Sequence, residues 1–282
     1  MDNLISVDDL VRQVIIKNKK DLPVFNKTAM KVQQKFAGRN DPDMDKIIGY
    51  IQQDQTLAAD VIALANSPFY KGISKVTTIK DAATRLGTIE LSNCVLQATQ
   101  SVNYNSKDRF SQQYMTAMWQ HSLACAAGSQ WIVQRAGHGE LAHQAFLCGL
   151  MHDIGKLLVL KAFEIIKQTR ARKMEISLTA KHEFLNVLHS AYGYELMHLW
   201  NLPEEYCIVC RDHHEDEFDE DNLLLIATRL ADLACKKTGI GINKDPGLVL
   251  VTCPEANILN LSEITLAELE LALEKRIYIR DQ

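Results

Sequence analysis

Apolar residues recur at intervals of three or four along most of the chain. The residues Leu57, Val61, Ile62, Leu64 and Ala65 show this spacing, and no long stretch alternates between apolar and polar residues. Side chains three or four positions apart share one face of an α-helix, whereas strict alternation would indicate a strand. The pattern therefore predicts an all-α protein.

The predicted helices fall into two groups, separated by a polar segment rich in turn-forming residues at 103–108. Shorter helices are predicted at 5–19, 26–37, 43–53, 56–66, 79–86 and 88–101, and longer ones at 110–136, 140–160, 180–200, 203–213 and 222–237, followed by a final helix at 265–279. We expect a two-lobe protein, with an N-terminal helical lobe at 1–105 and a C-terminal helical bundle at 106–282 on which the final helix docks. The connections are short, which indicates that the lobes pack against each other.

Glycines and prolines interrupt the helical pattern between residues 239 and 261. An apolar run at 248–251 lies within this segment. Its length suits either a short strand or an extended segment packed on the helices.

Composition and charge narrow the class of protein. Hydrophobic residues make up 47% and charged residues 23% of the chain, as in folded globular proteins. The net charge of −4 supplies no general positive field, so nucleic acid is not expected as a partner. The N-terminus lacks the pattern of a signal peptide, and no apolar run has the length of a membrane span. A cytoplasmic protein with no membrane partner is expected.

Seven cysteines are scattered along the chain, and their odd number does not indicate a disulfide framework. Reduced, buried thiols are therefore expected. Cys207, Cys210 and His213 have a spacing that zinc accepts, but no second pair of ligands follows at the spacing of a zinc module. A zinc-stabilised scaffold is the weaker alternative.

The sharpest local feature is the pair His152-Asp153, which the pattern places inside the apolar helix predicted at 140–160. A buried carboxylate without a partner is very costly, so the pair needs one. A divalent cation is a suitable partner, because imidazole and carboxylate groups together bind zinc, iron or manganese. The alternative is a hydrogen-bonded pair that serves only packing.

Further candidate ligands lie on other predicted helices, from which inward-facing side chains can converge on one ion. We predict that His121, His152, Asp153 and Asp232 hold a metal that activates water. Asp153 and Lys156 are the candidate catalytic residues, since a lysine following the pair can neutralise a substrate phosphate. The alternative for Lys156 is an exposed lysine at the end of a helix.

A second metal is a weaker prediction, with His189, His213 and His214 as its ligands. Each of these could instead cap a helix or bond a backbone carbonyl. Gly193, one turn after His189, would permit a close approach of helices. The remaining histidines are assigned no role; they are His138, His143, His182 and His198.

These motifs resemble the HD superfamily of metal-dependent phosphohydrolases. The resemblance rests on His152-Asp153 with a histidine upstream and an aspartate downstream. His189 with Gly193, and the run 213–215, look like the extra ligands of the HD-GYP branch, whose members are cyclic-di-GMP phosphodiesterases with two or three metals. Where that branch has its Gly-Tyr-Pro signature, this chain has the acidic run 216–221.

The N-terminal motifs are similar to the opening of an HDOD domain. They are Leu22-Pro23, Ile51-Gln-Gln-Asp54, the runs 64–70 and 79–87, and, further along, Trp200-Asn-Leu-Pro203. The resemblance spans about residues 20–235 and implies a bacterial signal-transduction or regulatory protein.

Two functions follow as expectations from the resemblance. The first is an interaction or ligand-binding module that contacts a signalling protein or a nucleotide ligand, with an HD-type metal-site framework that is vestigial or structural. The alternative is a metal-dependent phosphohydrolase, a phosphodiesterase acting on a nucleotide or cyclic dinucleotide. The implied cofactor is a divalent metal, namely iron, manganese, zinc, magnesium or nickel.

Overall fold

The computed structural model describes residues 7–17, 23–36, 43–68, 70, 72–169 and 177–278. These residues form helices and connecting loops, with no strand among them, so the all-α prediction is confirmed. The α-helices are α1 (Val7–Lys17), α2 (Lys27–Phe36), α3 (Met44–Gln52), α4 (Gln55–Ala65), α5 (Ile79–Ser101), α6 (Arg109–Arg135), α7 (Ala142–Met151), α8 (Ile154–Thr169), α9 (Leu178–Leu199), α10 (Glu204–Asp212), α11 (Leu223–Thr238), α12 (Pro254–Ile258) and α13 (Glu263–Tyr278), with short 3₁₀ helices η2 (Gly139–Leu141) and η3 (Leu250–Thr252). The predicted positions 5, 6, 18, 19, 37 and 279, together with Leu22 and Phe69 of the N-terminal motifs, lie outside the described residues.

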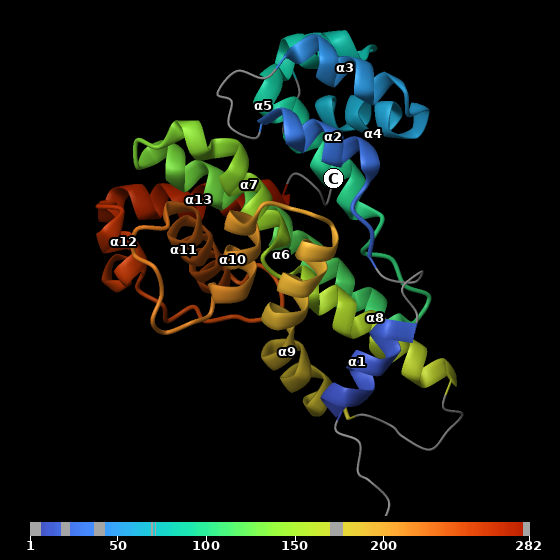
Figure 1. The fold of residues 1–282 in the computed structure, drawn as a ribbon. Coiled ribbons are helices and arrows are strands. Elements are labelled where there is room, and N and C mark those ends of the chain that lie inside the picture. Colours follow the sequence, from blue (N-terminus) through green and yellow to red (C-terminus); the bar gives the residue numbers. More distant parts are fainter. Residues whose placement is uncertain are drawn as a thin grey trace, which may run out of the picture.

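Helices α2, α3, α4 and the first part of α5 gather at one end of the molecule (Figure 1). Helix α5 begins with a capping box in which Thr78 and Asp81 each bond the other's backbone N–H. It bends at Gly87, whose φ of 74° is in the left-handed region that favours glycine. The bend explains why the sequence pattern predicts separate helices at 79–86 and 88–101.

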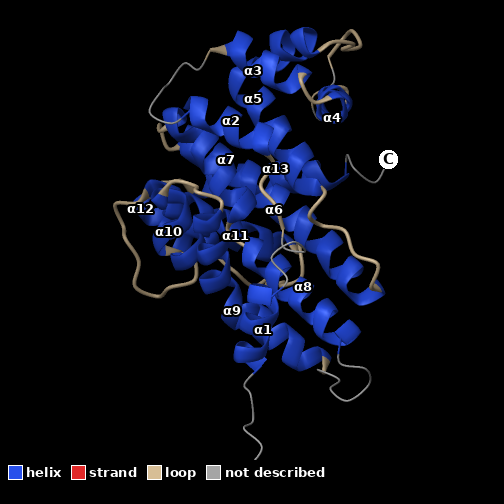
Figure 2. Ribbon diagram, turned by 45° about the vertical axis from the view of Figure 1, so that its right-hand side comes forward, coloured by secondary structure: helices blue, strands red, loops and turns tan. Residues whose placement is uncertain are grey.

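The remaining helices form the bundle that carries the candidate site. Helix α6 packs against both α7 and α11, while α9 packs against α8 and α10 (Figure 2). The final helix α13 docks on α6 and α11, as its amphipathic pattern predicts. Helices α6 to α11 thus surround one region of the bundle, and each supplies or flanks a candidate ligand.

Helix α1 lies far from the N-terminal group and packs on α8 (Figure 1). The Tyr192 hydroxyl of α9 donates to the Asp8 carboxylate at 2.6 Å, and Arg12 lies over the ring of Tyr192. Although α1 precedes the predicted boundary at residue 105, its contacts are with helices that follow it.

One local prediction needs correction, and one alternative left open by the sequence is excluded. The helix predicted at 140–160 is two helices, α7 and α8, and His152-Asp153 forms the turn between them. The His152 ring donates from Nδ1 to the Gly149 carbonyl at 2.9 Å, and the N–H of Lys156 bonds Asp153 O, so the α-helical ladder is interrupted. The run 248–251 is no strand, since residues 250–252 form η3.

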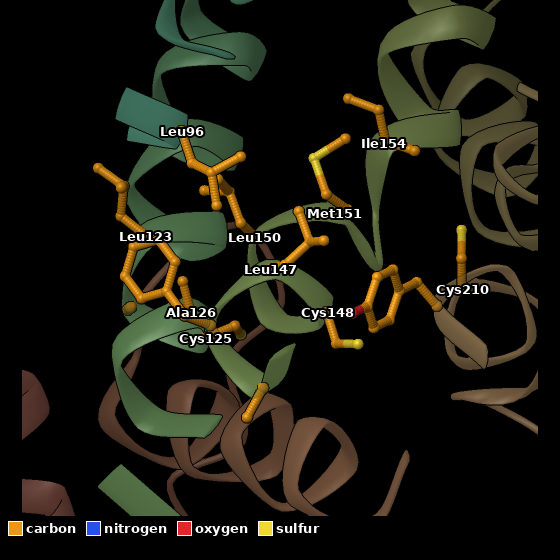
Figure 3. Close-up of a cluster of buried hydrophobic side chains, with 14 of the residues drawn as sticks. Leu96, Leu123, Cys125, Ala126, Leu147, Cys148, Leu150, Met151, Ile154 and Cys210 are labelled. Carbon is orange, nitrogen blue, oxygen red and sulfur yellow. The ribbon is translucent and has the colours of Figure 1, made fainter. Parts of the chain in front are cut away.

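One hydrophobic core runs beneath the site and into the N-terminal group. Figure 3 shows Leu96 of α5, Leu123 of α6 and Leu150 of α7 within a single cluster, and all three are buried. The buried half of α5 therefore joins the two groups of helices. Within the described part of the chain, no helix has the length and apolar character needed to cross a membrane.

Candidate metal centre

The candidate ligands come from separate helices and meet at one place. Helix α6 supplies His121, and α11 supplies Asp232. The turn between α7 and α8 supplies His152 and Asp153. His189 lies on α9, while His213 and His214 follow the end of α10. The structure thus brings together the candidate ligands of both predicted metal groups, which are the histidines and aspartates named above.

Four of the imidazoles share one orientation. The Nδ1 atoms of His152, His189 and His213 each lie 2.8–2.9 Å from the carbonyl oxygen three residues earlier, and His121 Nδ1 lies 3.3 Å from Ile240 O. Because a carbonyl only accepts, Nδ1 must carry the proton. In its neutral form such a ring presents an Nε2 lone pair to the centre, and this is how backbone carbonyls orient metal-binding histidines.

Three acceptor atoms form a triangle on one side of Asp153. His189 Nε2 lies 3.3 Å from His213 Nε2 and 3.3 Å from Asp153 Oδ1, and His213 Nε2 lies 3.6 Å from the same oxygen. In a tetrahedral zinc site with bonds of about 2.0–2.1 Å, ligand atoms stand about 3.3–3.4 Å apart. Asp153 Oδ1 is buried and receives no hydrogen bond among the described residues. A cation fits this arrangement.

A second set of donor atoms lies on the other side of Asp153. His121 Nε2 is 3.3 Å from both His152 Nε2 and Asp232 Oδ1. Asp153 Oδ2 is 3.5 Å from His121 Nε2 and from His152 Nε2. The two oxygens of Asp153 therefore face two different groups of imidazoles, so this one carboxylate could contribute a ligand atom to each group.

The charge states of these groups suit a cation. Burial lowers the pKa of His152 and of His189 to about 3, so both rings are neutral at pH 7. Although burial opposes ionisation, Lys156 holds the pKa of Asp153 well below its usual range. For Asp232, the bond with His121 and the charge of Lys236 likewise outweigh burial and lower the pKa.

His121 differs from the other ligands. Burial lowers its pKa, but its contacts with Cys125 and Asp232 raise the pKa further than burial lowers it. The Asp232 carboxylate, whose Oδ1 lies 3.3 Å from His121 Nε2, is a partner that the other three imidazoles lack.

A cleft opens at this centre. Its walls include Tyr114, Lys156, His214, Lys236 and Asn243. His214 is exposed, and its ring centroid lies 4.0 Å from that of His213. A ligand can therefore reach the metal-binding groups from solvent.

Three residues near the site carried no role in the sequence analysis. Cys125 lies one turn beyond His121, with its sulfur 3.5 Å from Nε2. Lys236 bonds Asp232 and lines the cleft, and its i,i+4 spacing from Asp232 was the available signal. Gly155 is where α8 approaches α9, since a Cβ there would overlap the His189 carbonyl and lie 2.6 Å from Gly193 N.

The zinc scaffold considered for Cys207, Cys210 and His213 has no support in the geometry. The Cys210 thiol donates to the His152 carbonyl at 3.1 Å, and Cys207 faces Leu202 O. These three side chains do not form a group of ligands within the described residues. The two cysteines pack the core instead.

The fold is shared with solved structures. An HDOD domain protein with unknown function from Geobacter sulfurreducens has a TM-score of 0.73 and 19% identity, covering 98% of this chain and 97% of that one. A structure from Marinobacter aquaeolei VT8, described provisionally as a signal transduction protein, has a TM-score of 0.71 and 20% identity, covering 96% of this chain and 63% of that one.

Sequence comparisons identify the family. An uncharacterized protein of Treponema pallidum is 26% identical over 203 residues, which are 69% of this chain but 38% of the relative, so the chain spans less than half of that relative's length. The family model of the HDOD domain matches residues 22–216. That match extends from the N-terminal helices to the histidines after α10, and the chain therefore belongs to the HDOD family.

Proposed function

We propose that this protein is a metal-binding HDOD signalling module, which holds up to two divalent cations and uses them to bind a phosphate-bearing ligand. One group would comprise His121, His152, Asp232 and Asp153, and the other His189, His213 and Asp153, with His214 beside it at the cleft. This assignment keeps both ligand sets expected from the sequence.

The main support for the proposal is the position of the two Asp153 oxygens relative to the surrounding imidazoles. Each oxygen lies 3.3–3.6 Å from two Nε2 atoms whose lone pairs point inward, and Asp153 is only 2% exposed. Acceptors crowded together in the interior repel one another unless a cation or proton lies among them. On the His189 side, the depressed pKa of His189 argues against a proton, which leaves a metal ion as the fitting occupant.

The metal-loaded site would favour an anionic ligand. Two carboxylates and two lysines border the centre, so each added divalent cation leaves an excess of positive charge. In a partly buried cleft that excess favours an anion such as a phosphate group. A nucleotide or cyclic dinucleotide carries such groups.

Metal binding can be tested by titrating metal-free protein with Zn²⁺ or Mn²⁺ and measuring the bound metal after desalting. We expect up to two ions per chain. Asp153→Asn should weaken both sites by more than about tenfold, because the negative charge is lost and only one of the two carboxylate oxygens remains. His189→Gln should weaken one site only.

His138→Gln provides the control, because that partly exposed ring pairs with Glu140 and belongs to no candidate metal group among the described residues. It should leave the metal content unchanged. If the wild-type protein retained no metal, or if Asp153→Asn bound as much as wild type, the proposal would be wrong.

Hydrolysis is the second candidate function, favoured by the open cleft beside the two groups of ligands. A bound divalent cation lowers the pKa of water to about 7 and so supplies hydroxide. In such a reaction Asp153 would hold the metal groups together, and Lys156 would balance charge on the phosphate. Release of nitrophenol from bis-nitrophenyl phosphate by the metal-loaded protein, absent in Asp153→Asn, would support this function over simple binding.

A further inference from the structure

Two lysines hold the two carboxylates of the centre. Lys156 Nζ bonds Asp153 Oδ2 at 2.7 Å, and Lys236 Nζ bonds Asp232 Oδ2 at 2.5 Å. The side chains are 9% and 24% exposed, respectively, and both line the same cleft. Asp232 thus has one oxygen directed at an imidazole and the other bonded to an ammonium group, whereas both oxygens of Asp153 face imidazoles and Oδ2 also bonds Lys156.

The position of Lys236 follows from the helix. It lies four residues after Asp232 on α11, so the two side chains share a face. Lys237, the next residue, points elsewhere and bonds Glu270 of α13 at 2.6 Å. Of these neighbouring lysines, only Lys236 lines the cleft.

Metal binding would change the electrostatic interaction between the Lys236 ammonium group and the Asp232 carboxylate. Without a metal, its ammonium group balances the charge of Asp232. A divalent cation on Asp232 Oδ1 would neutralise that carboxylate and repel the nearby ammonium group. A lysine has a flexible four-carbon stem, so the group can turn from Asp232 into the cleft.

We propose that Lys236 is an anion-binding residue that exchanges partners: it compensates Asp232 in the metal-free protein and, once a divalent cation binds, holds a phosphate group beside Lys156. The inference rests on the proposed metal binding. A phosphate ester is the expected anion, because its oxygens can bind a metal ion and also accept charge-assisted hydrogen bonds from ammonium groups.

Because Lys236 would exchange Asp232 for phosphate when the metal binds, the binding of the divalent cation and the binding of phosphate should be coupled. Phosphate should bind the metal-loaded protein much more tightly than the metal-free protein, because in the latter each lysine is already paired. Each ligand should then strengthen the binding of the other by the same factor.

Lys236→Met should change the affinity for phosphate and the affinity for the metal ion in opposite directions. Phosphate affinity should fall about tenfold, since a charged hydrogen bond is lost. Metal affinity should rise about threefold, since a repelling cation is removed. Lys236→Arg keeps the charge and should stay near wild type in both measurements, and Lys237→Met should alter neither.

Inorganic phosphate and Mn²⁺ are suitable probes. The free Mn²⁺ signal in electron paramagnetic resonance gives metal affinity, and the broadening of the ³¹P resonance by protein-bound Mn²⁺ gives phosphate affinity and proximity. If Lys236→Met does not fold without metal, Lys236→Gln removes the charge while keeping a hydrogen-bond donor for Asp232.

The outcomes separate this inference from the proposed function. If Mn²⁺ does not bind the wild-type protein, both are overturned. If Mn²⁺ binds but phosphate binds the metal-free protein equally well, or Lys236→Met leaves phosphate affinity unchanged, only the role of Lys236 is refuted. Opposite shifts in Lys236→Met, absent in Lys237→Met, would establish it.

Discussion

At the scale of single residues, backbone carbonyls decide what the histidines can do. A histidine near a helix end can donate from Nδ1 to the carbonyl three residues earlier, as His152, His189 and His213 do. This bond fixes the tautomer and turns Nε2 toward the centre. The chemistry of the site thus depends on local backbone geometry as well as on residue identity.

His143 shows the opposite use of a buried histidine. Its two ring nitrogens lie 3.2 and 2.7 Å from the side-chain amides of Asn93 and Gln33, and burial lowers its pKa to about 3. The folded protein therefore holds this ring neutral below pH 6.5, where the unfolded chain takes up a proton. The resulting stability is full above pH 6.5 and decreases as the pH falls toward 3.

We predict that His143→Gln reduces the pH dependence of stability. Between pH 7.5 and 5.5, His143 should account for about 1 kcal/mol of the loss in unfolding free energy. Urea unfolding of the metal-free proteins at both pH values measures the difference. An equal loss in wild type and in His143→Gln would show that the His143 ring titrates normally in the folded protein.

At the scale of elements, the close approach of α8 and α9 positions His189 against Asp153. Gly155 faces the His189 carbonyl, and Gly193 lies opposite it, so neither helix has a side chain at the crossing. The small Gly193 noted from the sequence thus has the packing role expected of it. Its partner, Gly155, depends on tertiary contacts that no local pattern reveals.

Gly155→Ala should destabilise the protein by about 3 kcal/mol, because the added methyl group must push the helices apart. It should also weaken the metal group of His189 and His213. Gly49→Ala is the matched control: nothing lies within 4 Å of its Cβ position in α3, so it should be neutral or stabilising by up to about 1 kcal/mol. Urea unfolding and metal titration test both variants, and a Gly155→Ala protein as stable as wild type would contradict the packing argument.

The sequence pattern predicted the positions of the helices better than the turn that interrupts one of them. Apolar periodicity placed the helices because their buried faces are continuous, and the family motifs indicated which histidines to expect together. The pattern missed the turn at 152–153, since the apolar run continues through it and the break comes from a side chain bonding the backbone. Lys236 was missed for a related reason: a lysine beside an aspartate is common on helices, and only the cleft distinguishes it.

At the scale of the whole molecule, the candidate metal centre would act as a cross-link among helices. Its ligands come from α6, the α7–α8 turn, α9, the end of α10 and α11, whereas α2, α3 and α4 contribute none. A ligand that binds only the folded state adds about 2.7 kcal/mol of stability at a concentration one hundred times its Kd. That stabilisation should act first on the helices that supply ligands.

Hydrogen exchange with and without Zn²⁺ therefore tests the proposed division near residue 105. If the lobes open separately, zinc should slow exchange in α6 to α11 and leave α3 and α4 unchanged. Helix α5 is the informative element, because it packs on α3 and α4 and its half after Gly87, which includes Leu96, joins the core of α6 and α7. Slowing in this second half alone would place the functional boundary at the bend at Gly87; uniform slowing throughout α3 to α11 would mean that the two groups of helices unfold as one unit.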